Sequence, residues 1–349
     1  MLLLRRVLER RARTSALVAA GLGLFAYAVW PWTPMAREAR TPRTIVFYGF
    51  SILGEAINKG VFPEFQRQWK KSHRERVEIV SSFAGSGTIT NQVILGVPAH
   101  LALLSLELDA DKLADAKVLT AGSWKKFPFE GVVNRTPFVI LVRPGNPKGI
   151  HDFEDLARPG VRIVHPDPLT SGGANWAIIA EYGAGARHSP DPAAGGHAML
   201  LGVWKNVVTQ AASARAARTQ FENGFGDALV TYEQDAIFDL SREKLEAELV
   251  YPRSTVLSEH TLVRVDRNIS RREKDLVDAF STFLFSEDAQ RIFVRYGFRS
   301  VLEPLNDANP RFGKIEDPFR IGDVGGWKSA KKEIVEAVWK NRVLEEIKK

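Results

Sequence analysis

The sequence predicts an α/β fold of two lobes, each with a mixed, mostly parallel sheet flanked by helices. From Thr44 onward, short apolar segments alternate with longer amphipathic ones, which is typical of strands and helices packed in layers. The chain has 349 residues, enough for two separate cores. Because the alternation starts again near Thr136, we expect the chain to pass between the lobes near residues 136 and 260, forming a double hinge.

Each predicted strand of the first lobe ends in a loop that opens a helix. Ligands of open α/β sheets gather at such strand ends. The helix after the first strand carries Phe62, Phe65 and Trp69 on the face expected to be buried. The predicted elements are strand 45–50, helix 54–71, strand 77–83, helix 88–96 and strand 101–106.

The second lobe repeats this alternation before the chain returns to the first lobe. Its predicted elements are strand 138–143, a short helix at 152–156, strand 162–164, helix 174–182, a Gly-, Pro- and Ala-rich surface insertion at 184–196, and strand 228–232. Strand 261–265 leads back, followed by helices 274–296 and 328–349. We therefore predict a first lobe of 44–135 plus 260–310, a second lobe of 136–259, and a C-terminal helical segment, 311–349, packing across both.

Residues 1–43 predict a signal peptide or signal anchor. This segment carries six of the seven net positive charges, followed by an almost uncharged run at 15–32 with a small-residue Ala26-Tyr27-Ala28 site. The orientation predicts a periplasmic protein whose membrane contact is confined to this segment. Whether the leader is cleaved stays open, because its apolar run lies at the lower limit for spanning a bilayer. The rest of the chain is nearly neutral, which argues against nucleic acid as a partner.

Two turns of the same construction follow strands in the two predicted lobes. Residues 83–88 contain Gly85-Ser86-Gly87, and residues 169–174 contain Ser171-Gly172-Gly173. Glycines let backbone N–H groups approach a ligand, and a helix N-terminus adds about half a positive charge, so the pair predicts an anion clamp. Ser51, after the first strand, and Tyr232, at a strand end, are further candidate donors, although an N-cap and a half-buried aromatic are the plainer interpretations.

Several segments carry a resemblance to a known family, across roughly residues 44–335. They are Tyr48-Gly49-Phe50-Ser51 with Glu55, Ala84-Gly85-Ser86-Gly87, 142–148, 166–176 with Ser171-Gly172-Gly173, Ala214-Arg215, Gly224-Phe225-Gly226-Asp227 and Val324-Gly325-Gly326-Trp327. Together they resemble the periplasmic sulfate-binding proteins of ATP-driven (ABC) importers.

That resemblance implies a type II periplasmic-binding-protein fold and a sulfate or thiosulfate dianion held by uncharged donors between the lobes. The implied donors are Ser86 from the first lobe and Ser171, Gly172, Gly173 and Ala214 from the second. It also implies a monomer that closes around the anion and delivers it to an ABC permease in the inner membrane.

The sequence departs from the family at the two further candidate donors, Ser51 and Tyr232. The family has an aspartate at Ser51 and a tryptophan at Tyr232; both replacements still offer a donor. Arg215 or Arg218 could add charge to the site, but a solvated helix face is the favoured interpretation for Arg218. The anion could therefore also be phosphate, molybdate or a sulfonate.

Other function classes find less support. No nucleophile elbow, phosphate-binding loop or H-E-x-x-H motif is present, and the seven histidines have no metal-ligand spacing, so we expect no enzyme, cofactor or metal site. We interpret His165 as a satisfied loop histidine. Asp109 with Asp111, and Glu233 with Asp235, are interpreted as exposed acidic edges. The alternative that stays open is a membrane-anchored sensor or scaffold of the same fold.

Overall fold

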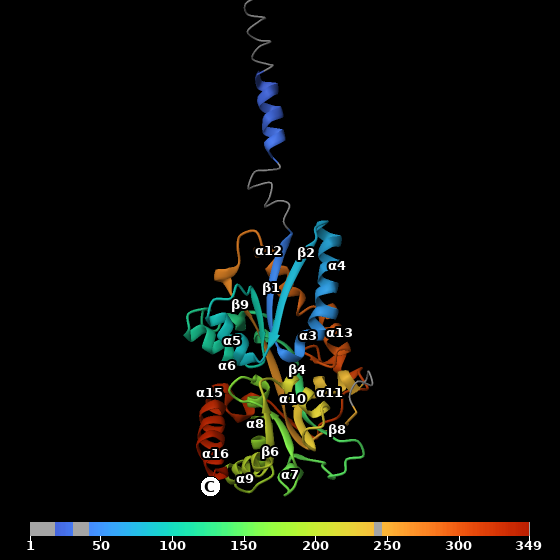
Figure 1. The fold of residues 1–349 in the computed structure, drawn as a ribbon, viewed down its shortest axis with the longest axis vertical. Coiled ribbons are helices and arrows are strands. Elements are labelled where there is room, and N and C mark those ends of the chain that lie inside the picture. Colours follow the sequence, from blue (N-terminus) through green and yellow to red (C-terminus); the bar gives the residue numbers. More distant parts are fainter. Residues whose placement is uncertain (1–17, 31–41, 241–245, 349) are drawn as a thin grey trace, which may run out of the picture.

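The computed structural model describes residues 18–30, 42–240 and 246–348. An apolar helix at 18–29 projects from the end of an elongated body, and its side chains are exposed (Figure 1). In these ranges, no helix combines the length and apolar character needed to cross a membrane. Most of the predicted leader, 1–17 and 31–41, lies outside the described residues.

The body is built around one mixed sheet with helices on its faces (Figure 1). Strands pair in parallel at both ends of the sheet, and antiparallel pairs gather in the middle. The predicted α/β class is confirmed. The strand order is β2 (Val77–Ala84), β1 (Arg43–Phe50), β3 (Leu101–Leu104), β9 (Ser254–Arg264), β4 (Val132–Val142), β7 (Ala228–Tyr232), β5 (Ile163–Pro166) and β6 (Val207–Ala211). The short strands β8 (Glu248–Val250), β10 (Arg299–Ser300) and β11 (Asp317–Phe319) pair at β4 and β9.

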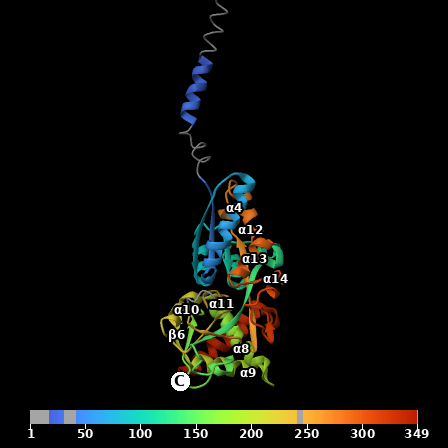
Figure 2. The same ribbon diagram turned by 90° about the vertical axis from the view of Figure 1, so that its right-hand side faces the viewer.

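Two long antiparallel strands, β4 and β9, join an upper half to a lower half (Figure 2). The upper half holds β1, β2 and β3, and the lower half holds β5, β6 and β7. In β4, the first residues pair with β10 and β9 and the last residues with β7 and β8. The predicted lobe boundaries at 135/136 and 259/260 thus fall inside continuous strands, and the division itself stays a prediction.

The upper half contains the expected helices, with one predicted helix divided in two. The helix at 274–296 is wrong as a single element: α12 (Lys274–Phe283) ends before Ser286, whose hydroxyl accepts from Ala289 N and starts α13 (Glu287–Arg295). The predicted helix at 54–71 is present but contains a π turn. The elements are η2 (Ser51–Leu53), α3 (Gly54–Ala56), η3 (Ile57–Val61), α4 (Phe62–His73), α5 (Ser86–Ile94), α6 (Glu107–Asp115), η4 (Ser123–Lys126), η5 (Pro128–Gly131), η6 (Asp266–Asn268) and α14 (Pro304–Asp307).

The predicted surface insertion at 184–196 is wrong, because two packed helices occupy it. These are α8 (Gly172–Arg187) and α9 (Pro192–Lys205). A Cβ on Gly185 would lie 2.5 Å from the carbonyl oxygen of Gly195, so only glycines let the two backbones approach this closely. The small residues therefore indicate close helix packing here. The lower half also contains α7 (Phe153–Leu156), α10 (Ala214–Glu222) and α11 (Glu233–Leu240).

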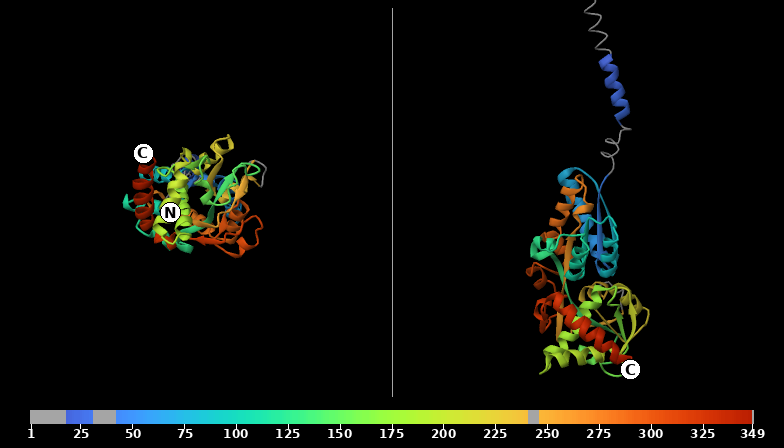
Figure 3. Two further views of the ribbon diagram at one scale, coloured as in Figure 1. Left: turned by 90° about the horizontal axis from the view of Figure 1, so that it is seen from below. Right: turned by 90° about the vertical axis from the view of Figure 1, so that its left-hand side faces the viewer.

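The C-terminal helix lies mainly on the lower half (Figure 3). After η7 (Ile321–Val324) it runs through α15 (Gly326–Ala330), a π-helical stretch η8 (Lys331–Val343) and α16 (Leu344–Ile347). Trp339 meets Trp204 of α9 edge to face, with ring centroids 4.9 Å apart. Its first turn reaches the upper half, where Lys328 lies 3.9 Å from Asp111 of α6.

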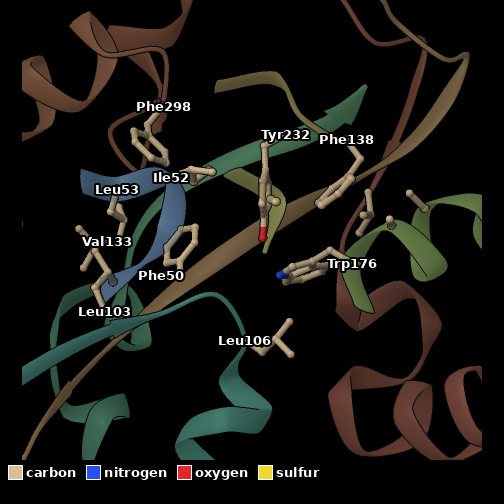
Figure 4. Packing of buried hydrophobic residues seen from close by; sticks show 14 of the residues in the cluster. Phe50, Ile52, Leu53, Leu103, Leu106, Val133, Phe138, Trp176, Tyr232 and Phe298 are labelled. Atoms are coloured by element: carbon tan, nitrogen blue, oxygen red, sulfur yellow. The ribbon is translucent and has the colours of Figure 1, made fainter. Parts of the chain in front are cut away.

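The largest apolar cluster continues from the upper into the lower half. Figure 4 shows Phe50, Phe138 and Tyr232 beside one another, from β1, β4 and β7. The Tyr232 ring lies 4.5 Å from Phe138 and 6.0 Å from Phe50, between centroids. Aromatic side chains thus fix the strand end that carries Tyr232.

Candidate anion-binding site

Three helices begin at one place in the molecule, and each presents unpaired backbone N–H groups there. In α5, the first helical hydrogen bond runs from Ile89 N to Gly85 O at 2.9 Å, which leaves the N–H groups of Ser86, Gly87 and Thr88 without a helical acceptor. This α5 start follows β2 directly, as the Ser/Gly turn predicted.

The other two helices start in the lower half. In α8, Ala174 N donates to Ser171 O at 3.2 Å, so the N–H groups of Gly172 and Gly173 have no helical partner. In α10, the N-cap Ser213 accepts from Ala216 N at 3.1 Å, and the N–H of Ala214 has no partner within the helix. Each start thus combines open donors with the positive end of a helix dipole.

The three starts are in contact. A Cβ on Gly85 would lie 2.4 Å from Thr170 O, just before α8, and 2.8 Å from Ala212 O, just before α10. A Cβ on Gly172 would lie 3.1 Å from the Ser86 Cβ. The two Ser/Gly turns therefore face each other, and their glycines are required by the close approach of the backbones.

The remaining predicted residues lie around this point. Gly87 faces Thr170, because a Cβ on Gly87 would lie 3.3 Å from the carbonyl oxygen of Thr170. Ser51 begins η2, which packs against α10. A Cβ on Gly173 would lie 3.0 Å from the Tyr232 hydroxyl. All nine predicted site residues thus come from elements that meet here: Ser51, Gly85, Ser86, Gly87, Ser171, Gly172, Gly173, Ala214 and Tyr232.

Ser105, which sequence reasoning missed, connects the two halves. It follows β3, and its carbonyl accepts from the Trp176 indole N–H at 2.7 Å. Its hydroxyl lies 2.8 Å from the Tyr232 hydroxyl. In Figure 4, the Tyr232 hydroxyl and the Trp176 indole nitrogen lie close together. The predicted strand 101–106 placed Ser105 inside the strand, whereas β3 ends at Leu104 and leaves Ser105 at the strand end, where ligands of α/β sheets gather.

Asp109 is buried beneath the α5 start, so its interpretation as an exposed acidic edge is wrong. It lies in α6, is 1% exposed, and accepts from the Ser86 hydroxyl at 2.6 Å. Ser86 Oγ in turn accepts from Ser105 N at 3.0 Å. A hydroxyl has one proton, so in this arrangement Ser86 points its backbone N–H, and not its O–H, toward the other helix starts.

Tyr232 is fully enclosed, and burial raises the pKa of its phenol. It therefore stays a neutral O–H group at any ordinary pH. Its hydroxyl contacts Ser105 from the upper half and the start of α8 from the lower half. The plainer interpretation, a half-buried strand aromatic, does not describe this position, because the residue is 1% exposed and its hydroxyl is hydrogen-bonded between the halves.

Arg215 and Arg218 bind a buried carboxylate instead of adding charge at the helix starts. Arg218 Nη1 lies 2.9 Å from Asp235 Oδ1, and Arg215 Nη2 lies 3.5 Å from the same oxygen. Arg218 is 7% exposed, so its assignment to a solvated helix face is wrong. Asp235 is fully buried, which also corrects its interpretation as an exposed edge. The helix starts thus have neutral donors with paired charges one layer behind them.

Two further sequence interpretations are corrected by burial. Glu233 is fully buried beside Arg299, at 2.6 Å, and burial raises the pKa of its carboxyl. His165 lies in β5, not in a loop; its Nδ1 is 2.7 Å from Pro166 O and its Nε2 is 3.3 Å from Glu181. Within the described ranges, no group of three or more His, Asp or Glu side chains is arranged to hold a metal ion.

Comparison with known proteins gives the family. A model of the bacterial extracellular solute-binding protein family matches residues 54–299. The sulfate-binding protein of Salmonella typhimurium is 32% identical over 80% of this chain and 85% of its own length. The chain belongs to the sulfate- and thiosulfate-binding family of bacterial extracellular solute-binding proteins.

Further relatives agree with this placement in the solute-binding family. The thiosulfate-binding protein of Escherichia coli is 30% identical over 77% of this chain and 82% of its own length. Among solved structures, the sulfate-binding protein SubI of Mycobacterium tuberculosis matches with a TM-score of 0.75 and 28% identity, covering 83% of this chain and 99% of SubI. The predicted periplasmic-binding-protein fold is confirmed, and because these relatives are binding proteins, so is the expectation of a chain that is not an enzyme.

Proposed function

We propose that this chain is the exported receptor of an ABC importer and binds sulfate or thiosulfate where α5, α8 and α10 begin. The observation that carries the proposal is the meeting of three helix N-termini, from both halves, with open N–H groups and no unpaired charged side chain among them. The names of the curated relatives support the choice of anion.

The chemistry of the helix starts suits a dianion. Each N-terminus is equivalent to about half a positive charge, so three of them offset much of a charge of two without a counter-ion. Dipoles act strongly in a site shielded from water, where they replace the hydration that the anion loses. Donors without acceptors favour fully ionised sulfate. The oxygens of buried Asp109, one layer behind, already accept from Ser86 Oγ and Lys112 Nζ.

Closure of the halves is the proposed mechanism. The anion would first bind the donors of one half and then stabilise the closed form by also binding the donors of the other half. Ser105 supports this view, because its carbonyl and hydroxyl each contact a lower-half residue, Trp176 and Tyr232. The strands β4 and β9 would absorb the hinge motion, and the permease would recognise the closed form.

Calorimetric titration of the purified full chain with sulfate, thiosulfate, phosphate and molybdate tests the proposal. We expect tight binding of sulfate or thiosulfate at neutral pH, and none in a Gly172→Leu variant. Preference for phosphate or molybdate would keep the receptor and change its anion. The absence of binding to all four, with the folded state intact, would favour a sensor or scaffold anchored by an uncleaved leader.

A further inference from the structure

The end of the upper half that receives the N-terminal segment is strongly basic. Arg43, the first residue of β1, pairs with Glu75 after α4 at 2.8 Å and with Asp275 of α12 at 2.6 Å. These pairs bring two charged segments to the point where the chain enters the body (Figure 1). We name their charged residues the basic pole: Arg43, Lys70, Lys71, Arg74, Arg76, Arg271, Arg272 and Lys274, with Glu75, Glu273 and Asp275.

The basic pole separates charge within the protein. Its eight basic and three acidic residues give a net charge of +5, whereas residues 44–349 as a whole carry only +1. Arg43 lies outside 44–349, so the pole contributes +4 to that range, and the other residues of the range have a net charge of −3. The next charged residues inward change the net charge of the pole by only one; they are Arg264, Arg267, Glu78, Asp266 and Asp278. The body therefore has one positive end, and that end adjoins the N-terminal segment.

The fold does not account for these cations. Lys70 and Lys71 suit the negative end of α4, but Arg271 and Arg272 stand just before the N-terminus of α12, where positive charge is unfavourable. In the described part of the chain, five exposed pole residues form no ion pair: Lys70, Lys71, Arg74, Arg76 and Arg271. Unpaired like charges kept together at one end indicate a negatively charged partner outside the chain.

The N-terminal segment indicates which partner this is. The helix at 18–29 exposes large apolar side chains, with Leu22 at 65% and Phe25 at 67%. The eleven residues between Trp30, at the end of this helix, and Pro42 span at most about 40 Å. An apolar phase that takes up the helix therefore lies within reach of the basic pole, so the pole can contact its charged surface. We propose that the basic pole docks on the phosphate headgroups of an anionic bilayer leaflet beside the N-terminal segment.

Vesicle flotation of the full chain tests this docking, because the N-terminal segment is then common to all variants. Vesicles of phosphatidylcholine are compared with vesicles in which one third is phosphatidylglycerol. The pole variant is Arg74→Glu with Arg76→Glu and Arg271→Glu. The matched control reverses three exposed cations of the lower half, Lys205→Glu, Lys340→Glu and Arg342→Glu, with the same change in net charge.

We expect phosphatidylglycerol to raise the partition of the parent and the control alike. In the pole variant, the increase in partition caused by phosphatidylglycerol should be at least tenfold smaller, since each cation near an anionic surface raises partition by about fivefold. Glutamine at the same three positions should give an intermediate loss, with unchanged melting temperature in every variant. Equal partition of the pole and control variants overturns the proposal, and so does displacement of the parent by soluble glycerol phosphate at matched phosphate concentration, which indicates a small-anion site.

Discussion

Replacing Gly172 with alanine should weaken anion binding without unfolding the protein. The new Cβ would lie 2.7 Å from both Cβ and Oγ of Ser105, where ordinary contacts begin at 3.4 Å. Ser105 belongs to the upper half and Gly172 to the lower half, so the clash is relieved when the halves separate. Overpacking of this kind costs about 1 to 3 kcal/mol, and here the cost falls on the closed form alone, which corresponds to a loss of about 5- to 150-fold in affinity.

Titration calorimetry with sulfate measures the affinity, and thermal unfolding without ligand measures the fold. The matched control is Gly54→Ala, because its Cβ would meet only the Phe83 ring, at 3.6 Å, which is an ordinary contact. We expect the control to bind like the parent and both variants to melt within a few degrees of it. If Gly172→Ala bound sulfate within threefold of the parent, the closure model and this location of the site would be refuted.

Three further perturbations probe the buried polar groups. Burial lowers the pKa of His260 from 6.5 to about 3, so the folded state keeps this imidazole neutral while the unfolded chain protonates. The free energy of unfolding therefore falls as the pH drops below about 6.5, and His260 alone accounts for a loss of about 2 kcal/mol between pH 7 and pH 5. Urea unfolding at these two pH values should give a smaller stability difference for the His260→Gln variant than for the parent. Ser86→Ala should lower the free energy of unfolding by about 1 to 3 kcal/mol, because buried Asp109 loses a hydrogen-bond donor. A tenfold loss of anion affinity with unchanged stability would instead show that the Ser86 hydroxyl donates its proton to the anion. Arg218→Met should cost about 3 to 5 kcal/mol by leaving Asp235 poorly paired, and chemical denaturation should find less loss when Asp235→Asn is added; equal loss would contradict the pairing.

The sequence was most informative where local rules and tertiary structure coincide. A Ser/Gly turn after an apolar strand marks a helix N-terminus through local geometry alone, and both turns were recognised in this way. That Gly85 and Gly172 face each other was expected from their placement in different halves. The contact itself depends on how β4 and β9 align the halves, which no local pattern encodes.

Buried charge was the main failure of sequence reasoning. Asp109, Glu233 and Asp235 were taken as exposed because unpaired carboxylates are seldom buried. Each has a partner distant in the sequence: Ser86 Oγ for Asp109, Arg299 for Glu233 and Arg218 for Asp235. Such pairs come from separate elements, so a single sequence read in order gives no sign of them.

Small residues gave a second kind of error. The stretch at 184–196 was predicted as a surface insertion because glycine and proline usually mark loops. In α8 and α9 the same glycines allow two helices to touch, and Pro192 occupies the first turn of α9, where its missing N–H costs nothing. Composition alone does not separate these cases, because glycine serves both purposes through the same lack of a side chain.

The arrangement of neutral donors and displaced charges has a consequence for closure. An arginine at the helix starts would attract the anion whether or not the halves met. Donors divided between α5 above and α8 and α10 below reach full strength only when the halves meet. Since a ligand shifts an equilibrium only by its differential affinity for the two states, divided dipoles couple binding to closure better than a resident charge does. In the proposed closure mechanism, the pairing of Arg215 and Arg218 with Asp235 would keep their charge from holding the anion in the open state.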